Sequence, residues 1–163
     1  MEKISEHVYW LPPAPPDRPS LCAVEGEGAT IWLDAGSSAA HTREFLDALA
    51  ARGVARPTHV VLTHSHWDHV FGGDELGAHV VAHELTAAYL HELAATDWSE
   101  EALDRRVTAG ESSQQHADNV KEELPSPRRR RHGGTRRSSS LVLRRTERMR
   151  VVADAVLSLG ERA

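Results

Sequence analysis

The chain has 163 residues, of which 40% are hydrophobic and 26% charged, and its net charge is −5. This length and composition are ordinary for one soluble globular domain with a buried core. A single cysteine, Cys22, excludes an internal disulfide and any multi-cysteine metal site. The N-terminus lacks the basic start and apolar run of a signal peptide, and no apolar stretch approaches the ~18 residues of a membrane span, so we expect a cytoplasmic protein.

The first 124 residues alternate between strand-like and helix-like segments. Runs rich in β-branched and aromatic residues predict strands over residues 4–11, 20–26, 29–36, 57–64 and 77–84. Helical patterns are found over residues 38–53, 85–97 and parts of the polar stretch 99–124, with a break at Gly110. This order predicts an α/β layered domain rather than a helical bundle.

The remaining residues differ sharply in composition. Residues 1–124 hold 8 basic and 21 acidic residues, a net charge of −13, whereas residues 125–163 hold 11 and 3, a net charge of +8. All eleven basic residues of the second segment are arginine. Its Arg-, Ser- and Gly-rich start predicts disorder, and later apolar residues at helical spacing predict a short helix over 146–160. We therefore divide the chain into a domain, residues 1–124, and a tail, residues 125–163.

Three interpretations of the tail stay open. It is a basic arm for nucleic acid or an acidic partner, a segment without a function, or the product of a shifted reading frame. Arginine, glycine, serine and proline without lysine are what a G+C-rich gene yields out of frame. Because the composition breaks abruptly at "ELPSPRRRR", we favour a frame shift or a truncation, which the DNA reading frame after the codon for Pro127 would test. The tail is the only hint of nucleic-acid binding, and we expect no such partner.

Residues 63–73, "THSHWDHVFGG", place three histidines and an aspartate within six positions: His64, His66, Asp68 and His69. They follow a predicted buried strand, and α/β sheets present ligand-binding loops at the carboxyl ends of their strands. Imidazole nitrogens and carboxylate oxygens are good zinc ligands. We expect Gly72 and Gly73 to let the backbone bend sharply after the cluster. A surface loop that happens to be rich in histidine is the alternative, but the spacing and the preceding strand favour a metal site.

The stretch "HSHWDH" resembles the H-x-H-x-D-H signature of the metallo-β-lactamase fold hydrolases. "ATIWLDAGS", "THVVLTHSHWDHVFGG" and "AHVVAHE" resemble the strands around that signature, so the resemblance covers roughly residues 4–95. It implies an αβ/βα sandwich, of which this chain carries the N-terminal half. It also implies two zinc ions, or iron or manganese, with His64 and His66 on the first metal and Asp68 and His69 on the second.

In most members of that family the reaction is hydrolysis of an ester, thioester, lactone, amide or phosphodiester by metal-bound hydroxide. Two metals ~3.5–4 Å apart can share a water and lower its pKa towards ~7. Asp68 is the candidate catalytic residue, because it could both bind a metal and orient this water. Asp34 has two open interpretations: it braces the metal loop from behind the ligands, or it caps the helix that starts near Ser38. Trp67 either lines a pocket or only packs.

The family's site also needs a histidine in a Gly-His turn, a bridging aspartate and a final histidine, for which this chain offers no convincing match. The downstream histidines are His79, His83, His91, His116 and His132. His83 matches a position that is usually structural, and His91 and His116 are interpreted as solvated. His132 precedes its glycines instead of following one.

We therefore expect a metal-dependent hydrolase that is truncated and impaired as written and that binds metal weakly. The alternative is a non-catalytic metal-binding remnant, or an interaction protein with a basic tail. We expect a small-molecule substrate and no membrane association. Half a sandwich leaves an apolar sheet face uncovered, which predicts self-association through that face.

Overall fold

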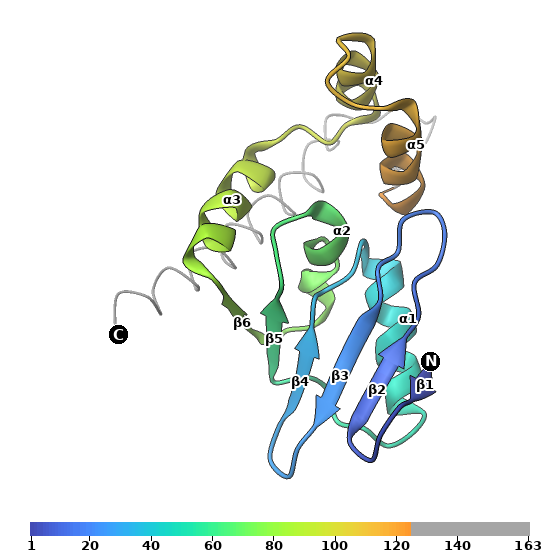
Figure 1. Cartoon of the computed structure of the whole chain (residues 1–163), viewed down its shortest axis with the longest axis vertical. Helices are drawn as coiled ribbons and strands as arrows, with labels where there is room; N and C mark the ends of the chain where they lie inside the picture. Colours follow the sequence, from blue (N-terminus) through green and yellow to red (C-terminus); the bar gives the residue numbers. More distant parts are fainter. Residues whose placement is uncertain (125–163) are drawn as a thin grey trace, which may run out of the picture.

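The structure, a computed structural model, describes residues 1–124, so the predictions of disorder and of a helix in the tail lie outside the described residues. Its centre is one sheet with the strand order β1-β2-β3-β4-β5-β6 (Figure 1). The strands are β1 (Glu2–Lys3), β2 (Val8–Leu11), β3 (Leu21–Glu25), β4 (Thr30–Leu33), β5 (His59–Leu62) and β6 (His79–Ala82). Strands β1 to β4 pair antiparallel, whereas β4, β5 and β6 run parallel. The sheet confirms the predicted α/β class.

One face of the sheet is covered by helix α1 (Ala39–Ala50), which lies behind the strands in Figure 1. The hydroxyl of Ser38 starts this helix by accepting a hydrogen bond from the amide of His41 at 3.2 Å. Phe45 and Leu49 of this helix are buried, and the Phe45 ring centroid is 4.7 Å from that of Trp32. The main hydrophobic core therefore lies between α1 and the sheet.

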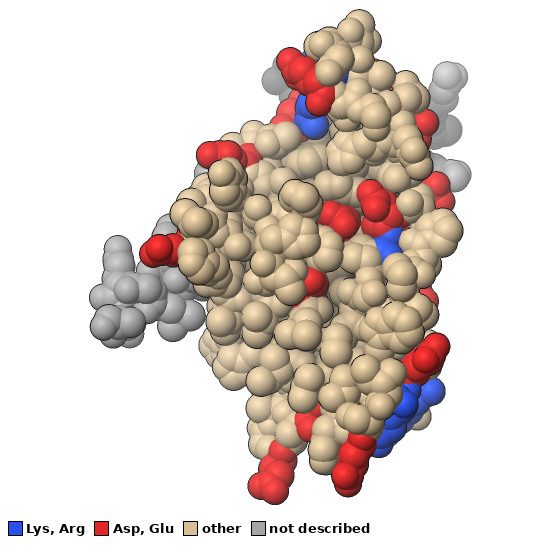
Figure 2. Space-filling view, in the orientation of Figure 1, with Lys and Arg blue, Asp and Glu red and all other residues tan. Residues whose placement is uncertain are grey.

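The opposite face of the sheet is more open. Because side chains alternate along a strand, Val24, Ile31, Leu33 and Val81 point away from α1, and they are 37–44% exposed. Figure 2 shows that uncharged side chains make up most of this face, with charged groups gathered towards its ends. Self-association through this face stays a prediction.

The other helices gather around the end of the sheet where β5 stops (Figure 1). They are α2 (Trp67–Val70), the 3-10 turn η1 (Gly73–Glu75), α3 (Glu84–Ala95), α4 (Glu100–Thr108) and α5 (Gln114–Glu123). Gly110, the predicted break, has φ of +75° between α4 and α5. A second, smaller core joins α2 to α4 and α5 through Trp67, Leu103 and Val120. No helix within residues 1–124 is long and apolar enough to cross a membrane.

A buried carboxylate fixes α5 against the start of α1. Glu123 is 6% exposed and accepts hydrogen bonds from the Ser38 hydroxyl at 2.5 Å and from Nε of Arg18 at 2.6 Å. Burial raises the pKa of Glu123, but the hydrogen bonds from Arg18 and Ser38 outweigh it and hold this pKa below its usual value. The helices over the end of β5 are therefore anchored by a charged group as well as by apolar packing.

Candidate metal centre

The structure brings the three histidines of the motif together at the carboxyl end of β5. Val60 and Leu62 of this strand are 1% and 5% exposed, whereas His59 and Val61 are half-buried, so the strand predicted to be buried is fully buried on one face only. The ring centroid of His64 lies 4.6 Å from that of His66 and 4.1 Å from that of His69. Asp68 joins the group, with its Oδ2 atom 3.3 Å from Nε2 of His69. We call these four residues, His64, His66, Asp68 and His69, the histidine motif.

Asp34 sets the hydrogen positions on two of these imidazoles. Nδ1 of His69 lies 2.8 Å from a carboxylate oxygen of Asp34, which only accepts when ionised, so Nδ1 of His69 carries the hydrogen. The Thr63 hydroxyl donates its one hydrogen to Asp34 at 2.9 Å and must therefore accept from Nδ1 of His64, also 2.9 Å away. In their neutral forms both imidazoles then keep a lone pair on Nε2, the arrangement that metal-binding histidines adopt.

The second interpretation of Asp34, as a helix cap, is wrong, since Ser38 caps α1. Asp34 instead ends β4 with φ of 61°, the left-handed region that few residues other than glycine adopt. It is 6% exposed and also accepts the amide of Thr63 at 2.8 Å. Such backbone strain is typical of functional sites, and here it turns the carboxylate towards the motif.

Backbone contacts lock the Asp34 turn to the motif segment. The amide of Ala35 donates to the carbonyl of His69 at 2.7 Å, and the amide of Gly72 donates to the carbonyl of Gly36 at 2.9 Å. A Cβ atom on Gly72 would lie 1.8 Å from Oγ1 of Thr42 and 2.2 Å from the carbonyl oxygen of Ala35. The chain turns at Gly72 as expected, but its φ of −82° is open to any residue, so the turn does not require glycine. Glycine is needed there because two segments approach closely.

The pKa values of Asp34, His64 and His69 are shifted in different directions. Burial raises the pKa of Asp34, but hydrogen bonds from His69 and Thr63 outweigh this and hold the pKa below its usual value. Burial lowers the pKa of His69, yet its hydrogen bond to Asp34 and the charges of Asp34 and Asp68 raise it overall. Burial, followed by the nearby His69 and His66, lowers the pKa of His64. The neutral form that can bind a metal is thus favoured at His64, whereas at His69 a metal would compete with a proton.

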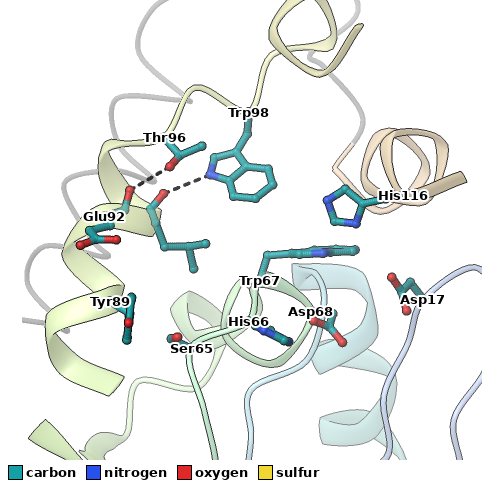
Figure 3. Close-up of a pocket in the computed structure, with 11 residues that line it drawn as sticks. Asp17, Ser65, His66, Trp67, Asp68, Tyr89, Glu92, Thr96, Trp98 and His116 are labelled. Atoms are coloured by element: carbon teal, nitrogen blue, oxygen red, sulfur yellow. Dashed lines mark hydrogen bonds between the residues drawn. The ribbon is translucent and has the colours of Figure 1, made fainter. Parts of the chain in front are cut away.

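A cavity of about 600 Å³ opens beside the motif, between α2, α3 and the start of α5 (Figure 3). His66, Trp67 and Asp68 form its floor, and Trp98 and His116 lie above Trp67. Trp67 meets both interpretations made from the sequence: it lines the cavity and, at 5% exposed, also packs in the smaller core.

His116 is the residue that the sequence interpretation missed. It is half-buried and lines the cavity, with its ring centroid 6.1 Å from that of Trp67, whereas the sequence suggested a solvated side chain. His79 is exposed on the open sheet face, and His83 caps α3 by accepting the amide of Leu85 at 3.2 Å. The structural role expected for His83 therefore fits its position, and only His116 among these lies beside the motif.

The donor chemistry of the motif fits zinc. Three imidazoles and one carboxylate are a typical donor set for this ion. Within residues 1–124, however, no three histidine, cysteine, aspartate or glutamate side chains surround one point as a bound ion requires. The described residues therefore provide suitable donors that have not converged on one centre.

The protein is thus an α/β domain that carries a histidine- and aspartate-rich loop at the carboxyl end of a parallel strand. The family model of the metallo-β-lactamase superfamily matches residues 16–158, which is most of the chain and extends into the arginine-rich tail. The chain belongs to the metallo-β-lactamase superfamily, as the sequence motif predicted. Members of this superfamily bind metal ions, typically zinc, and their fold is that of metal-dependent hydrolases.

Several solved structures are similar to part of the chain. A metallo-β-lactamase from Cronobacter sakazakii, altered in its HARLDQ motif, is 22% identical over 56% of this chain and 37% of its own, with a TM-score of 0.48. The subclass B3 metallo-β-lactamase BJP-1 of Bradyrhizobium japonicum is 22% identical over 55% and 35%, with a TM-score of 0.46. A metallo-β-lactamase from Pontibacter korlensis is 25% identical over 56% and 46%, with a TM-score of 0.47. The chain thus spans less than half the length of these proteins, and no curated protein matches it.

Proposed function

We propose that the histidine motif binds zinc and that the chain is a metal-dependent hydrolase of esters, thioesters, lactones, amides or phosphodiesters. The observation that carries this proposal is the contact of Asp34 with His69 and, through Thr63, with His64. A loop whose histidines are merely close together has no need of a buried, strained carboxylate that fixes their hydrogens. Superfamily membership supports the same chemistry.

The residues in and around the motif have different proposed roles. His64, His66, Asp68 and His69 are the proposed ligands, and Asp34 holds His69 in the orientation that binding requires. Bound zinc would supply a Lewis acid and a water of lowered pKa. Asp68, 18% exposed at its side chain and facing the cavity, is the proposed group that accepts a proton from the attacking water and orients it. The cavity beside it would hold a small-molecule substrate.

A second candidate, a metal-binding domain without turnover, rests on one observation. No three donors in residues 1–124 surround a single point, and four ligands shared by two ions leave each ion two, where a stable zinc site has three or four. We therefore expect zinc binding to be weak and hydrolysis to be slow. Slow turnover would support the hydrolase, and binding of zinc without turnover would support the metal-binding domain.

The deciding experiment is a hydrolysis assay with and without added zinc. The substrates are p-nitrophenyl acetate, a γ-lactone, a β-lactam and bis(p-nitrophenyl) phosphate. The full chain is compared with His66→Ala and with His79→Ala, a histidine on the open sheet face. Slow, zinc-dependent turnover that is lost only in His66→Ala supports the hydrolase. Zinc binding without turnover in any variant would leave the second candidate, and absence of zinc binding would overturn both.

A further inference from the structure

The cavity beside the motif has a wall that the zinc chemistry does not use. Helix α3 contributes Tyr89, Glu92 and Leu93, and the segment after it contributes Trp98. Figure 3 shows Tyr89, Glu92 and Trp98 along one side of the cavity, while His66 and Asp68 lie near its floor. A volume of about 600 Å³ is within the range of cavities that hold small organic ligands. This wall would contact the part of a substrate that does not react.

The aromatic surface of this wall is held in place. Nε1 of Trp98 donates to the carbonyl of Leu93 at 3.1 Å, and its ring meets Phe71 edge-on at a centroid distance of 5.1 Å. The guanidinium carbon of Arg106 lies 5.2 Å from the centroid of the Trp98 ring. Because Trp98 is already fixed, stacking an aromatic group on it costs little side-chain entropy. The wall therefore favours flat, apolar groups.

The carboxylates that line the cavity have no lysine or arginine among them in the described chain. These carboxylates belong to Asp17, Asp68 and Glu92. Arg106, which contacts Trp98, is not part of the lining, and its guanidinium donates to the carbonyl of Asp97. A substrate carboxylate or phosphate away from the reacting bond would thus face carboxylates without a matching cation.

We propose that this cavity selects substrates whose non-reacting part is aromatic and carries no negative charge. This inference rests on the proposed hydrolase, because it names the substrates that would reach the motif. Neutral or cationic aromatic esters, amides and lactones fit the wall. Substrates that carry an anion far from the scissile bond are disfavoured.

Binding of a matched pair of ligands tests the inference without requiring turnover. 1-Naphthylacetamide and 1-naphthylacetate have the same ring and nearly the same shape, and differ by one negative charge. Their dissociation constants for the full chain are measured by calorimetry with a chelator present, at pH 8, above the ordinary titration range of histidine. Because the carboxylates that line the cavity repel an anion, we expect the amide to bind roughly ten times more tightly than the carboxylate. Equal affinity, or tighter binding of the carboxylate, would overturn the inference.

Two substitutions assign the preference to the wall. Glu92→Gln should narrow the difference between the two ligands at least two-fold, whereas the control Glu122→Gln, an exposed residue of α5, should leave it unchanged. Trp98→Ala should weaken amide binding about ten-fold, the typical worth of one aromatic stacking contact. An unchanged difference in Glu92→Gln counts against the inference even if Trp98→Ala fails to fold. Failure of zinc-dependent turnover would overturn the proposed hydrolase but not this binding preference, so the two failures are distinguishable.

Discussion

Histidines lie at both ends of strand β5, and their side-chain contacts at the two ends are also similar. At the amino end, Oγ1 of Thr58 lies 2.9 Å from Nδ1 of His59, and at the carboxyl end, Oγ1 of Thr63 lies 2.9 Å from Nδ1 of His64. Each histidine also has a neighbouring ring, His79 at 5.5 Å and His69 at 4.1 Å between centroids. Close imidazoles alone therefore do not distinguish the two ends.

The difference lies in what the threonines and rings contact next. Thr58 donates to the backbone carbonyl of Thr30 at 3.3 Å, whereas Thr63 donates to the buried carboxylate of Asp34. His59 and His79 are opposite one another simply because β5 and β6 are in that register. The carboxyl end of β5 is the candidate functional site because it has a charged acceptor beside the imidazoles and lies next to a cavity.

The largest loss of stability is expected from adding a side chain at Gly72, where two backbone segments approach closely beside the motif. Gly72→Ala places a Cβ atom against the Ala35 carbonyl and Thr42, so we expect a loss of about 3 kcal/mol or more in the free energy of unfolding. Gly73→Ala is the matched control, because its Cβ would meet only Ala35 at an ordinary 3.7 Å. Urea unfolding of both variants measures this. Equal losses would contradict the packing argument.

The buried residue His41 should make the free energy of unfolding depend on pH, by an amount similar to the effect of Gly72→Ala. Burial, together with the positive charge of Arg18, lowers the pKa of His41 to about 4 from 6.5, and Glu123 opposes the shift. The unfolded chain then binds the proton more readily, so the free energy of unfolding should fall by up to about 3 kcal/mol as the pH drops from 6.5 to 4. Urea unfolding across this range should show a shallower slope in His41→Gln. The exposed His79→Gln should keep the slope of the unmodified chain, and an unchanged slope in His41→Gln would contradict the assignment.

Removing the charge of Asp34 should weaken zinc binding while leaving the four proposed ligands intact. Asp34→Asn can no longer accept from both His69 and Thr63 with a full negative charge, and loss of such partners typically costs ~10–100-fold in metal affinity. Calorimetric zinc titration measures the change. Asp47→Asn, on the exposed side of α1, is the control and should bind like the unmodified chain. An affinity in Asp34→Asn within two-fold of the control would show that the carboxylate does not support the ligands.

The smallest effect is expected at the amino end of β5. The double variant His59→Ala/His79→Ala removes the paired rings of the open face but touches nothing near the motif. Its zinc affinity and stoichiometry, measured in the same titration, should stay within about two-fold of the unmodified chain, because a pair of imidazoles gives two ligands at most. Loss of a bound equivalent would mean that the open face, and not the motif, takes up zinc.

Sequence reasoning found what depends on local pattern. Runs of β-branched and aromatic residues placed the strands, the helical pattern over residues 38–53 placed α1, and the motif identified the family. It missed what depends on contacts distant in sequence. Glu123 meets Ser38 across 85 positions, and His116 reaches the cavity only because α5 folds back over α2. The role of Gly72 was misjudged for the same reason, since its neighbour Thr42 lies thirty residues earlier.

The central claim, that Asp34 prepares the motif to bind zinc through Nε2, is most directly tested by nitrogen-15 NMR of the histidine rings. In the zinc-free chain near pH 8, we expect hydrogens on Nδ1 of His64 and His69. Adding zinc should then shift Nε2 of His64, His66 and His69, and leave His59 and His79 unchanged. Hydrogens on Nε2 in the zinc-free chain, or zinc-induced shifts confined to His59 and His79, would contradict it.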